Sequence, residues 1–266
     1  MTKGDQLLAV TDLVKHFPIK SGVVVDREVA RVRAVDGVSL SLREGETLGV
    51  VGESGCGKSL TMLSLMRLLP NKIKVTKGSA SFDGHDLQKM SNRELRKVRG
   101  GDIGFVFQDP MTSLNPVMRI GHQITEPLHE HTDMSRGEAN TSALALLRSV
   151  GIAEPERRMH EYPHQLSGGM CQRVMIALAL AAGPKLLIAD EPTTALDVTV
   201  QAQILDLLQD LQREFNSAII IITHDLGVVA EMTDDTLVMY GGRGVEYGKT
   251  SEILTHPEMP YTWGLL

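Results

Sequence analysis

The sequence has few cysteines and no long apolar run, and each shortage excludes a class of protein. Its 266 residues include two cysteines, Cys56 and Cys171. Two thiols are too few for a disulfide framework or a four-thiolate metal site. The longest strongly apolar run covers residues 218–222, far below the roughly 18 residues that a membrane-spanning helix needs.

The charge balance and the N-terminus exclude two further classes. The formal net charge of -6 argues against a protein that binds nucleic acid by neutralising phosphates. The first ten residues have no continuous apolar region followed by a small-residue cleavage site, so they are no secretory signal. We therefore expect a cytosolic chain that reaches a membrane only through a partner. The loose cluster of His122, His129 and His131 is interpreted as solvated surface.

Segments rich in Val, Ile and Leu alternate with segments of helical period, which favours an α/β fold with a largely parallel sheet. The strands are expected at residues 7–14, 32–42, 47–51, 79–83, 103–107, 185–189, 217–223, 237–240 and 244–247. The helices are expected at residues 58–69, 135–150, 169–182, 198–214 and 226–232. Residues 111–165 have helical periods and no convincing strand, which predicts a helical lobe inserted into the core. Residues 18–31 are interpreted as an extended hairpin.

The strongest chemical motif is GESGCGKS, residues 52–59, which follows an apolar strand and opens a helix. Glycines let the backbone wrap closely around phosphate groups with its N–H groups pointing inward. The helix that begins near Lys58 adds the positive end of its dipole. We expect Lys58 to reach the β- and γ-phosphates and the Ser59 hydroxyl to hold Mg²⁺. The alternative, a chance glycine-rich turn, would explain neither the apolar strand before the motif nor the helix after it.

Two further segments end in chemically useful side chains. KLLIADE, residues 185–191, is an apolar strand ending in Asp190 and Glu191. Asp190 could position Mg²⁺ at the carboxyl end of the sheet, and Glu191 could polarise the attacking water. LSGGMCQR, residues 166–173, places Ser167 before two glycines and a helix, which makes a second phosphate-binding surface. In isolation KLLIADE is a weak motif, and LSGGMCQR alone is better interpreted as a simple helix cap.

Two single residues at strand ends gain meaning only from this context. Gln108 follows the strand GFVF and stands at the entry to the helical lobe, where it could touch Mg²⁺ or water. His224 follows the apolar run SAIIIIT, and the end of a buried strand faces the crevice in which α/β proteins bind ligands. Without the other motifs, His224 is better interpreted as a surface histidine.

These motifs occur in the order of one family, and the chain resembles the nucleotide-binding subunits of ABC transporters over nearly its whole length. The order is phosphate loop, Gln108, the LSGG signature, Asp190 with Glu191, TALD at residues 194–197, and His224. The resemblance implies a P-loop NTPase core with an inserted helical subdomain and an N-terminal antiparallel β subdomain. It implies one nucleotide-binding domain at residues 6–262, with the core at 1–110 and 166–266 and the helical subdomain at 111–165.

The resemblance also implies roles for individual residues, with ATP and Mg²⁺ as ligands. The catalytic residues would be Glu191, His224 and Lys58, and the Mg²⁺ ligands would be Ser59, Gln108 and Asp190. ATP would lie between two such domains, so that one domain's phosphate loop faces the other's signature. The nucleotide contacts would be Phe17, Gly52, Glu53, Ser54, Gly55, Cys56, Gly57, Lys58, Ser59, Leu60, Gln108, Ser167, Gly168, Gly169 and Asp197. Phe17 is the candidate for adenine stacking, and a core phenylalanine is the equal alternative.

Finer motifs resemble the oligopeptide, dipeptide and nickel importer branch. They are QDPMTSLNP, YPHQLSGGM, ADEPTTALDVTVQAQIL and the terminal HPEMPYTWGLL. Cys171 departs from the arginine usual in that branch, and we expect it on the signature helix with the phosphate contact unaffected. Members often continue into a cysteine-rich tail that can hold an iron–sulfur cluster. This sequence has no such cysteines, so we expect no cluster.

The expected function is ATP hydrolysis that energises uptake of peptides or a related small solute. The partners implied are a second ABC ATPase subunit, two membrane-spanning permease subunits at the cytoplasmic face and, indirectly, an extracytoplasmic solute-binding protein, with no nucleic acid. Nickel or another solute is an alternative cargo. An ATPase of a soluble complex, such as one for phosphonate breakdown, and a DNA-repair or translation ATPase are alternatives of other classes. The solute and the choice between a homodimer and a heterodimer stay open.

Overall fold

The structure is a computed structural model that describes residues 4–21, 27–69, 75, 77–194 and 197–266. The chain divides into two compact units. The first unit comprises Met1–Ser91 and Ile222–Leu266, and the second comprises Asn92–Ile221. Within the described ranges, no helix is both long and apolar enough to cross a bilayer.

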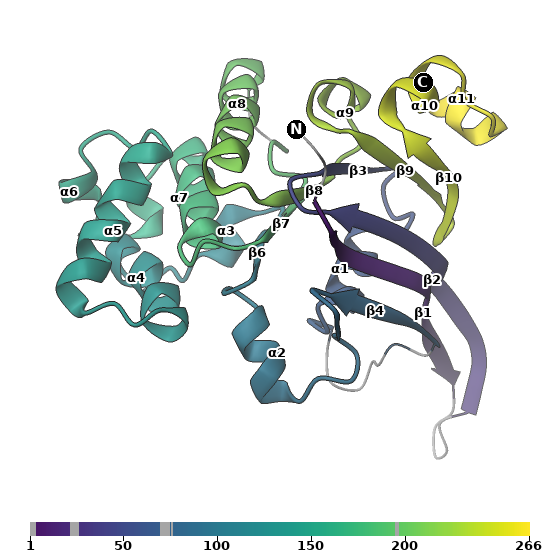
Figure 1. The fold of residues 1–266 in the computed structure, drawn as a ribbon, viewed down its shortest axis with the longest axis horizontal. Coiled ribbons are helices and arrows are strands. Elements are labelled where there is room, and N and C mark those ends of the chain that lie inside the picture. The colour runs from purple at the N-terminus through teal and green to yellow at the C-terminus, as the bar shows by residue number, and fades with distance from the viewer. Residues whose placement is uncertain (1–3, 22–26, 70–74, 76, 195–196) are drawn as a thin grey trace. The chain divides into compact units, whose positions relative to one another are not determined.

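An antiparallel sheet forms one part of the first unit (Figure 1). Its strand order is β2-β1-β4-β5, with β1 at Gln6–Ser21, β2 at Arg27–Arg43, β4 at Lys77–Phe82 and β5 at His85–Asp86. Phe17 pairs with Val32, and the β1–β2 ladder continues to Ser21 opposite Arg27. The expected extended hairpin is therefore confirmed on both sides of residues 22–26, which lie outside the described residues. The antiparallel β subdomain is confirmed as well.

The other strands of the first unit carry the phosphate loop. Parallel pairing joins β3 (Thr47–Val51) to β9 (Asp235–Tyr240), and β10 (Arg243–Lys249) pairs antiparallel with β9. The loop after β3 leads into α1 (Lys58–Leu65). The buried side chains of Val51, Val229, Val238 and Ile253 pack together. Those residues bring α9 (Leu226–Met232) and α10 (Thr250–Thr255) against the strands, and α11 (Pro260–Leu265) follows.

The expected helix at residues 58–69 is wrong at its C-terminal end. Helix α1 ends at Leu65, because Arg67 adopts a left-handed backbone conformation with φ 51°. A residue in this conformation cannot continue a right-handed helix. The Cβ penalty makes this conformation unusual for a non-glycine residue. Because no glycine stands at this position, the sequence gives no signal that the helix stops here.

The second unit combines parallel strands with flanking helices. Its strand order is β8-β7-β6, and β6 (Ile103–Val106) pairs parallel with β7 (Leu186–Asp190). β8 (Ala218–Ile222) ends at the boundary of the unit. Helices α7 (Gly168–Leu180) and α8 (Val198–Phe215) belong to this unit, and the short α2 (Asn92–Val98) precedes β6. The strands are buried along almost their whole length, as parallel strands covered on both faces are.

The predicted inserted segment, residues 111–165, contains helices and no strand, and the structure describes all of it. It holds α3 (Pro110–Ser113), α4 (Ile120–His131), α5 (Arg136–Ser149), α6 (Pro155–Arg158) and the 3-10 turn η1 (Pro163–Gln165). Helix α5 begins at a capping box in which Ser135 and Glu138 satisfy each other's backbone N–H groups. Figure 1 shows α4, α5 and α6 grouped together. The exact subdomain limits stay a prediction.

Candidate nucleotide-binding site

The phosphate loop depends on two glycines at which the backbone has no room for a side chain. Gly52 has φ 146° and Gly57 has φ 107°, both in the region that favours glycine. A Cβ at Gly52 would overlap the backbone oxygen of Met239, and one at Gly57 would overlap that of Ala34. The loop is therefore packed directly against the backbone of β9 and β2. This is the close approach that a phosphate-binding loop requires.

Lys58 lies folded over this loop and is only 5% exposed. Its Nζ donates hydrogen bonds to the backbone oxygens of Gly52, at 2.7 Å, and Glu53, at 3.0 Å. The sulfur of Cys56 lies 4.0 Å from the same Nζ. Burial raises the pKa of the Cys56 thiol. An ammonium held by two neutral carbonyls can exchange them for phosphate oxygens, which are stronger acceptors.

The start of α1 is open to an anion. Among the described residues, no side chain caps the helix, whose N-cap is Gly57. The first-turn N–H groups of a helix have no intrahelical partner, and the helix dipole favours negative charge there. Ser59 and Leu60 in this turn are partly buried, whereas Ser54 and Gly55 in the loop are exposed. The arrangement fits the expected phosphate contacts.

Phe17 and His224 are the remaining predicted site residues of the first unit. Phe17 is partly buried on β1, and the Nζ of Lys15 lies 5.4 Å from its ring centroid. A cation over the ring face makes a favourable contact with the π-electrons. His224 lies two residues after the end of β8 and is exposed. The next residue, Asp225, caps α9 by accepting from Gly227 N at 2.8 Å.

In the second unit, Gln108 and Glu191 meet directly. The Nε2 of Gln108 and the hydroxyl of Thr194 each donate to Glu191 Oε2, both at 2.8 Å. Glu191 has φ 46°, a left-handed backbone conformation that costs a non-glycine residue free energy. Backbone strain of this kind is concentrated at functional sites. Thr194 was noted in the sequence only as part of TALD, and its contact with Glu191 was not predicted.

Asp190 and Asp197 flank this arrangement along the chain. Asp190 ends β7 and is 6% exposed. Asp197 caps α8 by accepting from Val200 N at 2.9 Å. Ala195 and Leu196, the central residues of TALD, lie outside the described residues.

The signature segment forms the start of α7. Ser167 caps the helix by accepting from Met170 N at 3.3 Å, and Ser167 and Gly168 are exposed. Cys171 lies on this helix as expected, fully buried, with its thiol donating to Pro163 O at 3.4 Å. Burial raises the pKa of the Cys171 thiol. Cys171, the residue that departs from the branch, therefore faces the interior, whereas the capping Ser167 and Gly168 face solvent.

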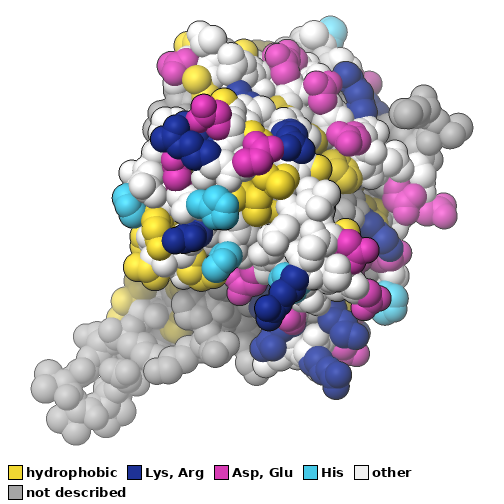
Figure 2. Space-filling model, turned by 90° about the vertical axis from the view of Figure 1, so that its left-hand side faces the viewer, with side chains coloured by type: hydrophobic (Ala, Val, Ile, Leu, Met, Phe, Trp, Pro, Cys, Tyr) yellow, Lys and Arg dark blue, Asp and Glu magenta, His cyan; other side chains and the backbone are white. Residues whose placement is uncertain are grey.

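A groove of about 580 Å³ lies beside α4 in the second unit. It is lined by Arg96, Met118, His122, Thr125, Glu126, His129 and Glu130. His122 and His129 are exposed, as expected for solvated surface, but His131 is partly buried beside the turn at Gly100 and Gly101. The face of the molecule seen in Figure 2 mixes acidic, basic and histidine side chains with apolar ones. Over the described residues, no group of three or more His, Cys, Asp or Glu could hold a metal ion.

Comparison with known proteins agrees with this geometry. The family profile described as "ABC transporter" matches residues 35–194. The oligopeptide transport ATP-binding protein OppD of Bacillus subtilis is 52% identical over 100% of this chain and 72% of its own length. The dipeptide transport ATP-binding protein DppD of the same organism is 49% identical over 98% of this chain and 76% of its own length. A solved dimeric ATP-binding cassette in a post-hydrolysis state with ADP and Pi has a TM-score of 0.80 at 30% identity, over 92% of this chain and 99% of that one.

The chain therefore belongs to the ABC transporter family of ATP-binding proteins. Its similarity to oligopeptide and dipeptide transport ATP-binding proteins confirms the resemblance to that branch. The expected fold class and the expected enzyme class, an ABC-type ATPase, are confirmed by the same matches.

Proposed function

We propose that this chain hydrolyses ATP to energise a peptide importer, with Glu191 as the residue that activates water. The observation that carries the proposal is the strained Glu191, whose carboxylate is held by Gln108 and Thr194 at the end of a buried strand. A carboxylate fixed by two donors is oriented in advance for one proton transfer. The names of the peptide-transport relatives support the choice of cargo.

The donor set fits Mg²⁺. Ser59 offers a hydroxyl, Gln108 an amide oxygen and Asp190 a carboxylate, and Mg²⁺ prefers oxygen ligands. Mg²⁺ is usually bound through one or two carboxylates together with substrate phosphates, and Asp190 is the carboxylate of this set. When bound, Mg²⁺ neutralises charge on the β- and γ-phosphates. We assign these three residues as its ligands.

The chain's own residues would divide the reaction between them. Lys58 leaves the carbonyls of Gly52 and Glu53 and binds the β- and γ-phosphates. Glu191 accepts a proton as the water oxygen bonds to the γ-phosphorus, and the bond to the β–γ bridging oxygen breaks. His224 hydrogen-bonds the γ-phosphate and stabilises its developing charge. The products are ADP and phosphate.

We further propose that the site is completed by a second ATPase subunit. Ser167, Gly168 and Gly169 would contact the γ-phosphate held by the phosphate loop of the facing subunit, and Asp197 would lie at the dimer interface. The exposed cap of α7 supports this, because its N-terminal groups face solvent. One matched cassette is described as dimeric. Phe17 stays the candidate for stacking on adenine.

The α4 groove supports a role for the helical segment as the receiver of a permease subunit. Its lining combines apolar, basic and acidic side chains, a composition suited to an amphipathic helix from a partner. Two permease subunits would then hold the ATPase at the cytoplasmic face of the membrane. An extracytoplasmic solute-binding protein would act with it only indirectly.

Replacement of Glu191 with Gln tests the proposal, because it keeps the side-chain shape and removes the base. ATP hydrolysis should fall by about 10²- to 10⁴-fold, while Mg·ATP traps a dimer detectable by size-exclusion chromatography. Glu214→Gln, an exposed change on α8, is the matched control and should leave both readouts unchanged. Hydrolysis that survives Glu191→Gln would overturn the assignment of the base. A variant that loses hydrolysis without dimerising would favour an unlike ATPase partner.

A further inference from the structure

The phosphate loop has a contact partner from the far end of the chain. The backbone N–H of Glu53 donates a hydrogen bond of 3.0 Å to the phenol oxygen of Tyr261, 208 residues away. Tyr261 is the second residue of α11, in the terminal segment HPEMPYTWGLL. The proposed hydrolysis mechanism does not use this contact. Both residues belong to the first unit.

The Glu53 peptide is held from both of its polar groups. Its N–H is bound by Tyr261, and its C=O accepts from Lys58 Nζ at 3.0 Å and from Cys56 N at 3.3 Å. Lys58 must give up this carbonyl to bind phosphates under the proposed function. Tyr261 is then the side chain that still fixes the Glu53 peptide. Its contribution to the loop geometry should therefore matter most when ATP is bound.

Tyr261 is itself fixed by its surroundings. Its ring lies 4.5 Å, centroid to centroid, from that of Tyr240 at the end of β9. Two residues later, Gly242 N donates to the loop oxygen of Cys56 at 2.8 Å. The β9–β10 turn therefore supports both the loop and the tyrosine. Burial raises the pKa of the Tyr261 phenol, a group that is already neutral at physiological pH at its usual pKa.

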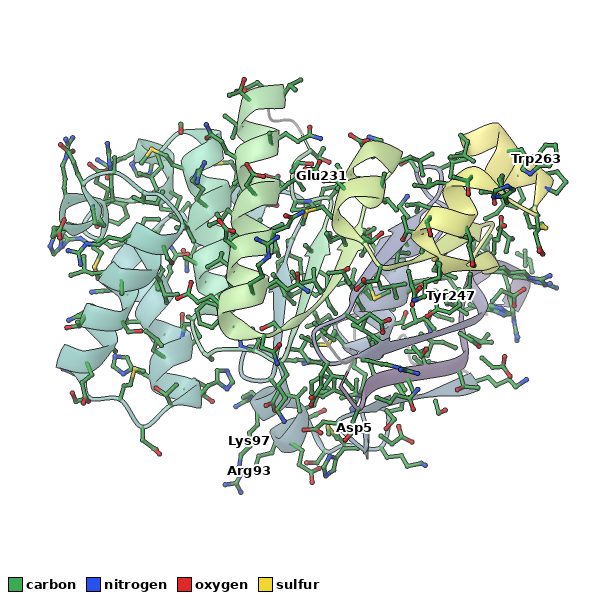
Figure 3. The ribbon with its side chains drawn as sticks, turned by 45° about the horizontal axis from the view of Figure 1, so that its top comes forward. Asp5, Arg93, Lys97, Glu231, Tyr247 and Trp263 are labelled. Atoms are coloured by element: carbon green, nitrogen blue, oxygen red, sulfur yellow. The ribbon has the colours of Figure 1, made fainter. Side chains whose placement is uncertain are left out.

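The start of α11 is also anchored. The carboxylate of Glu246 on β10 accepts from Glu258 N at 2.7 Å, from Met259 N at 3.4 Å and from the Thr262 hydroxyl. These bonds tie both sides of Tyr261 to the sheet that carries the phosphate loop. Movement of the phosphate loop should therefore be transmitted to α11. Trp263, two residues after Tyr261, is 66% exposed and lies at the outer end of this segment (Figure 3).

We propose that Tyr261 is a positioning residue for the phosphate loop and that α11 responds to nucleotide binding through it. The proposal rests on the proposed function, since it requires that ATP binds at residues 52–59. Loss of the phenol oxygen should weaken ATP binding and leave the chemical step unchanged. KM for ATP should therefore rise while kcat stays constant.

The first test compares Tyr261→Phe with Tyr247→Phe. Tyr247→Phe is a matched control, because it removes a phenol that donates to Ser41 O at 3.1 Å, outside the loop (Figure 3). Loss of one hydrogen bond predicts an increase of about 2- to 10-fold in the Kd for a fluorescent ATP analogue with Tyr261→Phe. Tyr247→Phe should leave this Kd unchanged. Thermal melting of both variants without nucleotide distinguishes a loop effect from a loss of folding.

The second test uses the emission of Trp263, the single tryptophan of the chain. Titration with Mg·ATP should change its emission in the unaltered chain and in Tyr247→Phe. The change should disappear in Tyr261→Phe at ATP concentrations that still saturate that variant, as measured with labelled ATP. An equal Kd and an equal emission change in both variants would overturn the role of Tyr261. An unaltered chain that binds no ATP would instead overturn the proposed function.

Discussion

At the scale of single residues, Asp36 joins three strands of the first unit near the phosphate loop. Its carboxylate accepts from Arg243 Nε at 2.9 Å and from His16 Nε2 at 2.8 Å. The adjacent backbone binds the β9–β10 turn, because Asp36 N donates to Gly242 O at 2.7 Å. Hydrogen bonds from Arg243 and then from His16 lower the pKa of Asp36 below its usual value.

This lowered pKa predicts a stability difference that depends on pH. A carboxyl group with a lower pKa in the folded state stabilises the fold above its unfolded pKa, and the effect is lost as pH falls through the folded pKa. Asp36→Asn should therefore lower the free energy of unfolding at pH 7. The difference from the unaltered chain should shrink progressively as the pH falls below about 4.

Urea unfolding at a series of pH values measures this difference, with Asp206→Asn on the exposed face of α8 as the control. A difference that stays constant down to acid pH would mean that the substitution disturbs packing and that the ionic contacts of Asp36 contribute little.

The positions of site residues were predictable where a motif fixes both the residue types and the backbone conformation. Gly52, Gly57 and Lys58 lie together as the loop pattern predicts. The contacts of Thr194 with Glu191 and of Tyr261 with Glu53 were not predictable. The second pair is separated by 208 residues, and no local pattern records so distant a hydrogen bond.

At the scale of elements, strand and helix positions followed from hydrophobic period, and their ends followed less well. β3 and α9 have the expected bounds, because residues typical of strand ends and helix caps border these segments. The short helices α2, α10 and α11 were missed, since six or seven residues give too few turns to show a period. Tertiary contacts, such as those of Glu246 with α11, hold such short helices in place.

The packing of β6 against α7 allows a sharp test at this scale. A Cβ at Gly104 on β6 would overlap the backbone oxygen of Ala179, which cannot turn away as a side chain could. Gly104→Ala should therefore destabilise the fold by about 1–3 kcal/mol through overpacking.

Gly137→Ala is the matched control, because nothing lies within 4 Å of the added carbon in α5. It should stabilise the fold by about 0.5–1 kcal/mol, since alanine favours the helix over glycine. Denaturant unfolding of both variants gives the comparison. Small and equal changes in the free energy of unfolding of the two variants would show that β6 and α7 move apart to make room for the added carbon without loss of stability.

At the scale of the whole molecule, each compact unit contains one of the two cysteines, and both thiols are buried. Cys56 is 7% exposed in the first unit, and Cys171 is 0% exposed in the second. A buried thiol reacts with an alkylating reagent only when its surroundings open. The two labelling rates therefore report opening of the two units separately.

Binding of ATP at the phosphate loop should protect Cys56 more than Cys171. A ligand that binds only the closed form stabilises it by RT ln(1 + [L]/Kd), so ATP at 100 times its Kd should slow labelling of Cys56 by about 100-fold. Mass spectrometry of both cysteine peptides, at a protein concentration too low for dimerisation, gives the two rates. Lys58→Ala is the control, in which protection of Cys56 should disappear because the phosphates lose their cation. Equal slowing at both thiols would mean that the units open in one cooperative step, and an unchanged rate at Cys56 would place ATP away from residues 52–59.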